Sequence, residues 1–140
     1  SQPDPASPPG NRDLHAELAR VCRTILASDP VFHVGRRALA LEQAARLHLS
    51  LATEVGSRRQ AWERYLRALT CIDEAIALTD PGPMANKLIT LMLARTRVLE
   101  LLGRKNAARA YFEHVAEVAR RHRVPLRPST PPPPPRPGEQ

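Results

Sequence analysis

Proline lies almost entirely at the two ends of this chain, and that distribution constrains the fold more than any other feature. Of the 15 prolines among 140 residues, four fall in residues 1–10 and eight in residues 125–140. Proline disrupts helix interiors, so its scarcity in between leaves the middle of the chain free to form long helices. Ala, Leu, Arg and Glu, which favour helix, are abundant there. The sequence therefore predicts an all-α domain at residues 12–123, between disordered Pro-rich tails at 1–11 and 124–140.

Apolar residues recur at helical spacing in five stretches, and turn signals separate these stretches. The expected helices span about 12–28, 36–55, 58–79, 84–102 and 104–122. Ser57 and Gln60 have the spacing of a capping box at the start of the third helix. Gly56 and Gly103 are expected to end the helices before them in the left-handed conformation. Short connections make neighbouring helices antiparallel, so we expect helical hairpins.

Residues 55–68 and 102–115 resemble each other, which indicates an internal repeat. Each copy has a glycine, a small residue five positions later, an aromatic residue after four more, and another small residue after three more. The matching pairs are Gly56 with Gly103, Ala61 with Ala108, Tyr65 with Phe112, and Ala68 with Val115. Small residues allow close approach of two helices, and the aromatic fills the groove between them. The pattern thus favours two packed hairpins.

This spacing resembles the second half of the tetratricopeptide repeat, and the resemblance covers about residues 38–122. It implies a stack of antiparallel helical hairpins. The first helix of each hairpin matches the family less well. The two glycines are also 47 residues apart, whereas the family repeats about every 34 residues. A HEAT-like hairpin array and an unrelated helical bundle are therefore the alternatives.

The resemblance implies a non-enzymatic adaptor or scaffold that binds another protein. The partner would be a peptide or helix held in a groove built by the second and fourth helices, or a second copy of the chain. On the second hairpin, the face toward this groove comprises Thr90, Leu93, Arg97 and Glu100. The family's clamp for peptide carboxylates has asparagine where this chain has Arg97, so a receptor for chaperone tails is not expected.

The chain carries no motif for catalysis or for binding a metal or cofactor. Its five histidines include no pair at metal-ligand spacing on a helix. Asp73 and Glu74 are adjacent on a helix and thus point in different directions. No glycine-rich phosphate loop is present. We therefore expect no enzymatic activity, no metal site and no cofactor, and we expect His48 to be a core residue.

The net charge of +7 favours an anionic partner, nucleic acid included. The candidate contact is a basic cluster near the end of the last helix, formed by Arg120, Arg121, Arg123 and Arg127. Cations at a helix C-terminus also complement the helix dipole, which is the simpler interpretation. The alternative function is therefore a basic helical domain that binds nucleic acid or another anionic partner in a regulatory role.

The C-terminal tail contains a PxxPxR pattern formed by Pro131, Pro134 and Arg136, which SH3 domains recognise as a polyproline II helix. Five consecutive prolines make this pattern hard to avoid, so a solvated spacer is the alternative. No apolar run is long enough to predict a membrane span. Cys22 and Cys71 are expected to be buried, reduced thiols, which favours a cytoplasmic location, with the nucleus as the alternative.

Overall fold

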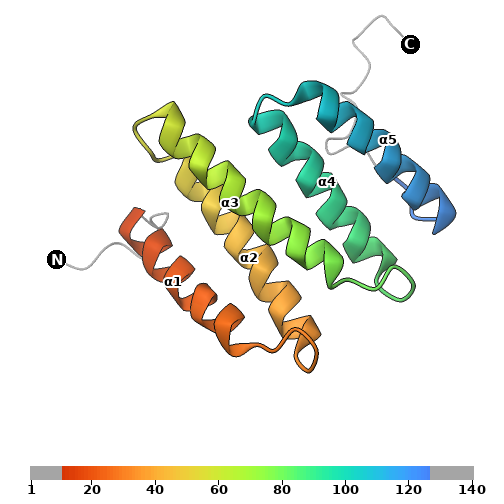
Figure 1. The fold of residues 1–140 in the computed structure, drawn as a ribbon, viewed down its shortest axis with the longest axis horizontal. Coiled ribbons are helices and arrows are strands. Elements are labelled where there is room, and N and C mark those ends of the chain that lie inside the picture. Colours follow the sequence, from red (N-terminus) through yellow and green to blue (C-terminus); the bar gives the residue numbers. More distant parts are fainter. Residues whose placement is uncertain (1–10, 127–140) are drawn as a thin grey trace, which may run out of the picture.

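Five helices follow one another in the computed structural model, which describes residues 11–126 (Figure 1). They are α1 (Asn11–Ala27), α2 (Val34–Ala52), α3 (Arg58–Ala77), α4 (Ala85–Leu101) and α5 (Lys105–Arg121). No strand occurs within this range, so the predicted all-α class and the number of helices are confirmed. The proline-rich motif Pro131, Pro134 and Arg136 lies outside the described residues, as does Arg127.

Each helix packs against the next one along the chain, so the molecule is a consecutive stack (Figure 1). α2 and α3 form one antiparallel hairpin, and α4 and α5 form a second. α1 covers the side of α2, and α3 and α4 join the two hairpins. The packing is consistent with the predicted stacking of helical hairpins.

The hydrophobic core extends through the whole stack, and α2 contributes to it on more than one side. Ala44 packs with α1 residues, whereas Ala45 packs with residues of α3 and α4. The core also reaches the chain after α5, because Val124 and Leu126 pack against the α4–α5 cluster. Those two residues therefore belong to the folded domain, not to the tail that the sequence predicted from residue 124.

The two glycines of the internal repeat have different conformations. Gly103 has φ +81°, and the amides of Gly103 and of the next residue donate to the carbonyls of Glu100 and Leu99, both at 2.9 Å. This is a Schellman motif, as the sequence predicts for Gly103. Gly56 is not in the left-handed region, so that prediction is wrong for Gly56. The physical reason is that α2 ends earlier than predicted, at a C-cap on Thr53 with ordinary right-handed geometry.

Ser57 begins α3 as the capping pattern predicts. Its backbone is extended, and its hydroxyl oxygen accepts a hydrogen bond from the amide of Gln60 at 3.2 Å. One of the unpaired amides at the start of the helix is thereby satisfied. The α2–α3 turn is thus fixed by a side-chain cap at the start of α3.

Two half-buried arginines connect neighbouring helices. Arg37 on α2 donates to the carbonyls of Ile25 and Ser28, at 2.7 and 3.2 Å, and to the Glu74 carboxylate on α3 at 2.9 Å. It therefore links the end of α1 to the first hairpin.

Arg95 on α4 donates to the Asp73 carboxylate on α3 at 2.7 Å. Its guanidinium group also lies 4.4 Å from the ring centroid of Tyr111 on α5, a cation–π geometry. Arg95 thus connects the two hairpins.

Candidate partner-binding surfaces

A mostly apolar groove of about 350 Å³ lies between α2 and α4, close to the α1–α2 and α3–α4 connections. We call it the α2–α4 groove. Its apolar lining comes from α2, the end of α3, and α4: Val34, Ala38, Leu39, Leu78, Met84 and Leu91. Leu39 and Met84 are 54% and 48% exposed, so their side chains remain available to a partner.

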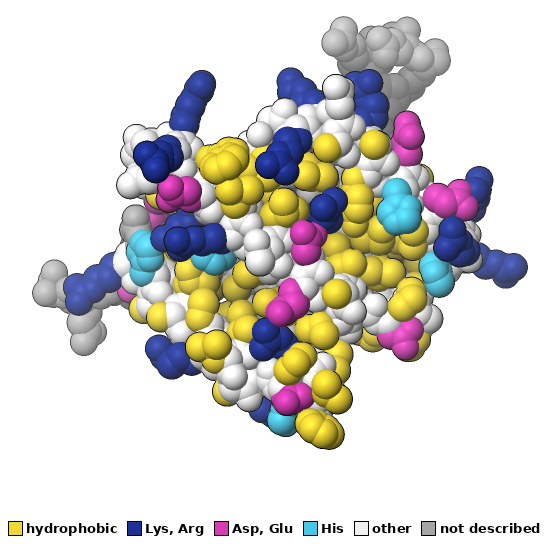
Figure 2. All heavy atoms as spheres, in the orientation of Figure 1, with side chains coloured by type: hydrophobic (Ala, Val, Ile, Leu, Met, Phe, Trp, Pro, Cys, Tyr) yellow, Lys and Arg dark blue, Asp and Glu magenta, His cyan; other side chains and the backbone are white. Residues whose placement is uncertain are grey.

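Further apolar side chains are exposed in the chain that leads into this groove. Val31 and Phe32, in the α1–α2 connection just before Val34, are 74% and 83% exposed. Figure 2 shows apolar side chains at the end of the molecule where α1 turns into α2. Exposed apolar groups that gather in this way mark interaction sites more often than isolated ones do. The groove and the adjacent connection therefore form the leading candidate surface.

A buried carboxylate in the wall of the α2–α4 groove is paired with two more exposed cations. The Glu42 side chain is buried, and its carboxylate accepts hydrogen bonds from Lys87 Nζ on α4 at 2.9 Å and from Arg46 Nη2 at 2.7 Å. A buried carboxylate requires such partners, because its desolvation is otherwise very unfavourable. The Glu42–Lys87 pair joins α2 to α4 at the groove.

The four residues predicted to line the binding groove lie elsewhere, although the groove itself is between α2 and α4. Thr90 is exposed, and its hydroxyl donates to a backbone carbonyl within α4. Leu93 is half-buried against the α4–α5 core cluster. Arg97 and Glu100 form an exposed ion pair at 3.8 Å. The predicted stripe is rotated by roughly a third of a turn around α4 from the groove-lining face.

Arg97 and Glu100 instead line a hollow of about 430 Å³ between α4 and α5. Phe112, which also lines it, is 45% exposed. Its counterpart in the internal repeat, Tyr65, is half-buried where α3 meets α4. Phe112 remains open because the described part of the chain has no helix beyond α5.

The basic cluster at the end of α5 is partly neutralised. Arg120 and Arg121 both form ion pairs with the Glu117 carboxylate. Arg123 is exposed and has φ 57°, just after the α5 C-cap. The structure therefore pairs two of the four predicted arginines with one carboxylate, which reduces the positive charge that the cluster presents.

The cysteines differ from the prediction. Cys22 is exposed, not buried, because it lies on the solvent side of α1, whereas Cys71 is half-buried; both are free thiols. Burial raises the pKa of Cys71 to about 11, so it is a thiol at neutral pH. Within residues 11–126, no three potential metal ligands lie together. None of the helices in that range is long and apolar enough to cross a membrane.

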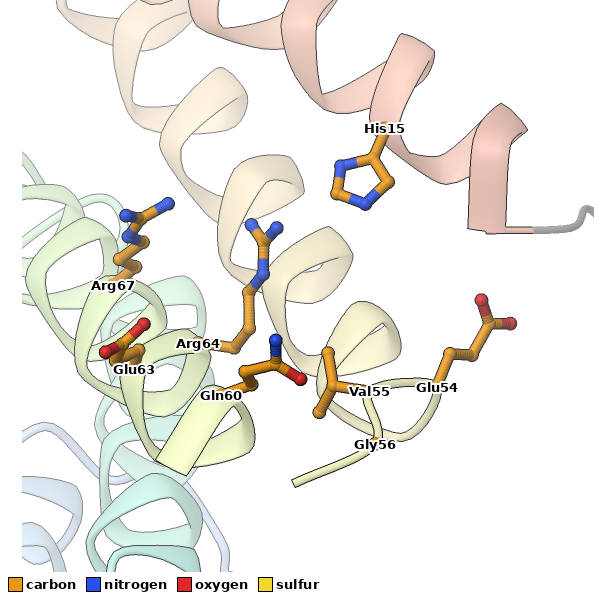
Figure 3. Close-up of a pocket in the computed structure, with 8 residues that line it drawn as sticks. All are labelled: His15, Glu54, Val55, Gly56, Gln60, Glu63, Arg64 and Arg67. Carbon is orange, nitrogen blue, oxygen red and sulfur yellow. The ribbon is translucent and has the colours of Figure 1, made fainter. Parts of the chain in front are cut away.

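A third concave site, a cavity of about 420 Å³, lies where α1 faces the α2–α3 hairpin (Figure 3). We call it the α1–α3 cavity. His15 on α1 and Gln60, Arg64 and Arg67 on α3 contribute to its lining. Sequence reasoning did not find this site, because its residues come from distant parts of the chain and match no motif.

His48 on α2 lies next to this cavity and is buried, as the sequence predicts. Its Nδ1 atom is 3.2 Å from Arg64 Nη1, so the imidazole accepts from the guanidinium and carries its proton on Nε2. Burial, and then the charges of Arg64 and Arg67, lower the pKa of His48 from 6.5 to about 4. His48 is therefore neutral at physiological pH.

No protein-family model, curated protein or solved structure matches this chain. The resemblance to the tetratricopeptide repeat therefore remains a prediction, which rests on the repeat residues and on the hairpin stacking. Four candidate surfaces are the α2–α4 groove, the α4–α5 hollow, the basic cluster and the α1–α3 cavity.

Proposed function

We propose that this chain is a non-enzymatic interaction module that binds another protein in the α2–α4 groove. The observation that carries the proposal is the exposure of Leu39 and Met84 on an apolar groove, beside the exposed Val31 and Phe32. Complete burial of one such side chain is worth about 1.5–3 kcal/mol. Two or three anchors from a partner would therefore give useful affinity. The role is that of an adaptor or scaffold, and the proposed location is the cytoplasm.

The chemistry of the groove suggests what the partner carries. The chain has a net charge of +7. Lys87 lines the groove, and Arg46 binds the same Glu42 carboxylate; their side chains are 39% and 71% exposed. Charge complementarity steers association and selects partners. We therefore propose a partner segment that is an amphipathic helix, with apolar anchors on one face and acidic residues beside them.

A photo-cross-linking experiment tests this proposal. A photoreactive amino acid is placed at Leu39, and for comparison at Trp62, which is 45% exposed on α3 and does not line the groove. Each protein is irradiated in a lysate from its own source, with and without Met84→Asp. We expect a discrete protein to cross-link at position 39 only, and to be lost with Met84→Asp. Sequencing the linked peptide should show an acidic, amphipathic segment.

Circular dichroism of each variant serves as the control for folding. Equal cross-linking from positions 39 and 62, or cross-linking at 39 that survives Met84→Asp in a folded protein, would contradict the proposed groove. A linked peptide without apolar anchors or acidic residues would contradict the proposed partner chemistry.

The second candidate is a nucleic-acid or anionic-surface binder that uses Arg120, Arg121, Arg123 and Arg127. It is favoured by the net positive charge and weakened by the ion pairs with Glu117. It predicts affinity that falls steeply as salt rises, because phosphate contacts release counterions. Binding that survives nuclease treatment and is insensitive to salt supports the protein-binding groove instead.

A further inference from the structure

The α1–α3 cavity holds positive charge that the fold does not neutralise. Three arginines of the described chain are half-buried: Arg37, Arg64 and Arg95. Arg37 and Arg95 each form an ion pair with a carboxylate. Arg64 forms none within residues 11–126; its side-chain partner there is the neutral His48. Among residues 11–126, Arg64 is thus the one half-buried arginine without an ion-pair partner.

The surroundings of Arg64 do not supply the missing negative charge. Arg67, one helical turn away, also lines the cavity and forms no ion pair within the described residues. Glu63 lines the cavity but pairs with Arg59 at 3.6 Å. In Figure 3 the Glu54 carboxylate points away from the two guanidinium groups. Glu54 and Glu63 thus line the cavity without forming an ion pair with Arg64 or Arg67.

The elements around the cavity also suit an anion. Gln60, in the first turn of α3, lines it, so the positive end of the α3 dipole lies at the cavity. His15 faces it from α1 (Figure 3). His48 is neutral and accepts from Arg64, which leaves the other guanidinium donors free to bind a ligand. Guanidinium groups match the geometry of phosphate oxygens and bind them through paired hydrogen bonds.

We propose that the α1–α3 cavity is a binding site for a phosphoryl group, held by Arg64 and Arg67 with His15 at its rim. Its volume of about 420 Å³ is within the range of small-ligand sites. The site lies apart from the α2–α4 groove and uses none of the groove's residues, so it goes beyond the proposed protein-binding function. The ligand is either a small phosphorylated metabolite or a phosphorylated side chain, because both present the same dianion.

The test uses the full-length protein and NMR spectroscopy of the histidine rings at constant ionic strength and neutral pH. Inorganic phosphate, O-phosphoserine and adenosine monophosphate are titrated separately, with chloride as the ionic control. We expect saturable shifts of the His15 and His48 signals with the phosphoryl compounds and none with chloride. Tighter binding of O-phosphoserine indicates a phosphorylated side chain, whereas tighter binding of adenosine monophosphate indicates a metabolite.

Three variants test whether phosphate binding depends on the two arginines of the cavity. Arg64→Gln and Arg67→Gln should each weaken phosphate binding by about tenfold or more, the effect of a lost charge-assisted hydrogen bond. Arg109→Gln makes the same change of charge on α5, outside the cavity, and should leave the affinity within about twofold. Arg67 is exposed, so its variant should fold even where Arg64→Gln does not. Shifts that do not saturate, or equal weakening by Arg109→Gln, would overturn the proposal.

Discussion

The side chain of His48 makes the stability of this fold depend on pH. The imidazole is buried, and Arg64 and Arg67 lie close to it, so protonation would place a third positive charge beside them. The folded protein therefore resists protonation of His48, whereas the unfolded chain accepts the proton near pH 6.5. Mildly acidic conditions should therefore lower the stability of the domain.

We predict that the free energy of unfolding decreases as the pH falls from 6.5 toward 4. The pKa of His48 is lowered to about 4 in the fold, so across this window the unfolded state binds a proton that the folded state does not. The expected loss is on the order of 2 kcal/mol, reduced from the full shift because the site is partly hydrated. Urea unfolding across this range measures it.

His48→Gln provides the comparison, since glutamine offers a hydrogen-bond acceptor but does not titrate. Its stability should change less across the same window. His114→Gln, an exposed change on α5, should retain the wild-type pH dependence. If wild type and His48→Gln lose stability in parallel, another group is responsible.

The ends of the helices show where local sequence dictates structure and where it does not. Gly103 and Gly56 have equivalent places in the internal repeat, yet only Gly103 has positive φ. The α4–α5 turn is a tight Schellman motif, whereas the α2–α3 turn includes extra residues after the Thr53 C-cap. The turn after α4 therefore uses the left-handed conformation of its glycine, whereas the turn after α2 does not.

Alanine at the two positions should therefore have unequal effects. Gly103→Ala is expected to decrease stability by about 1 kcal/mol, because a side chain disfavours the left-handed conformation. Gly56→Ala is expected to change stability by less than about 0.5 kcal/mol, since its φ is ordinary and a Cβ there meets no atom within 4 Å. Thermal unfolding of both variants measures the difference. Equal losses would show that the two turns are alike.

At the scale of the whole molecule, the stack depends on side chains that connect neighbouring helices. Arg37 connects α1 with the first hairpin, and Arg95 connects the two hairpins. The stack also becomes less apolar at its far side. Continued at the same spacing of 47 residues, Leu69 of α3 corresponds to Ala116 of α5. The outer surface of α5 is therefore less suited to seat another helix than the α3 surface that seats α4.

We predict that Arg37→Met and Arg95→Met loosen opposite ends of the stack. Arg37→Met leaves two carbonyls and Glu74 without their donor, so α1 should exchange its amide hydrogens faster while α5 changes little. Arg95→Met should produce the reverse pattern. Hydrogen exchange followed by mass spectrometry measures both, with an expected destabilisation of about 2–3 kcal/mol at the affected end. Uniform acceleration in both variants would show that the stack unfolds as one unit.

The sequence alone determined the helices, their order and the hairpin stacking. These properties depend on signals only a few residues apart: the apolar period, the proline-containing breaks and the Ser57 cap. The burial of His48 and the left-handed Gly103 were predictable for the same reason. The sequence did not show that α2 ends at Thr53, before Gly56, or that Cys22 lies on the exposed side of α1.

The tertiary structure alone decided which surfaces face one another. The rotation of α4 set which of its faces meets α2, so Leu91, and not Leu93, lines the α2–α4 groove. Arg64 and His48 are 16 residues apart in sequence, and His15 joins them from a third helix. No periodicity within one helix records how neighbouring helices are rotated and spaced. Packing across the core sets that geometry, and with it the groove and the cavity.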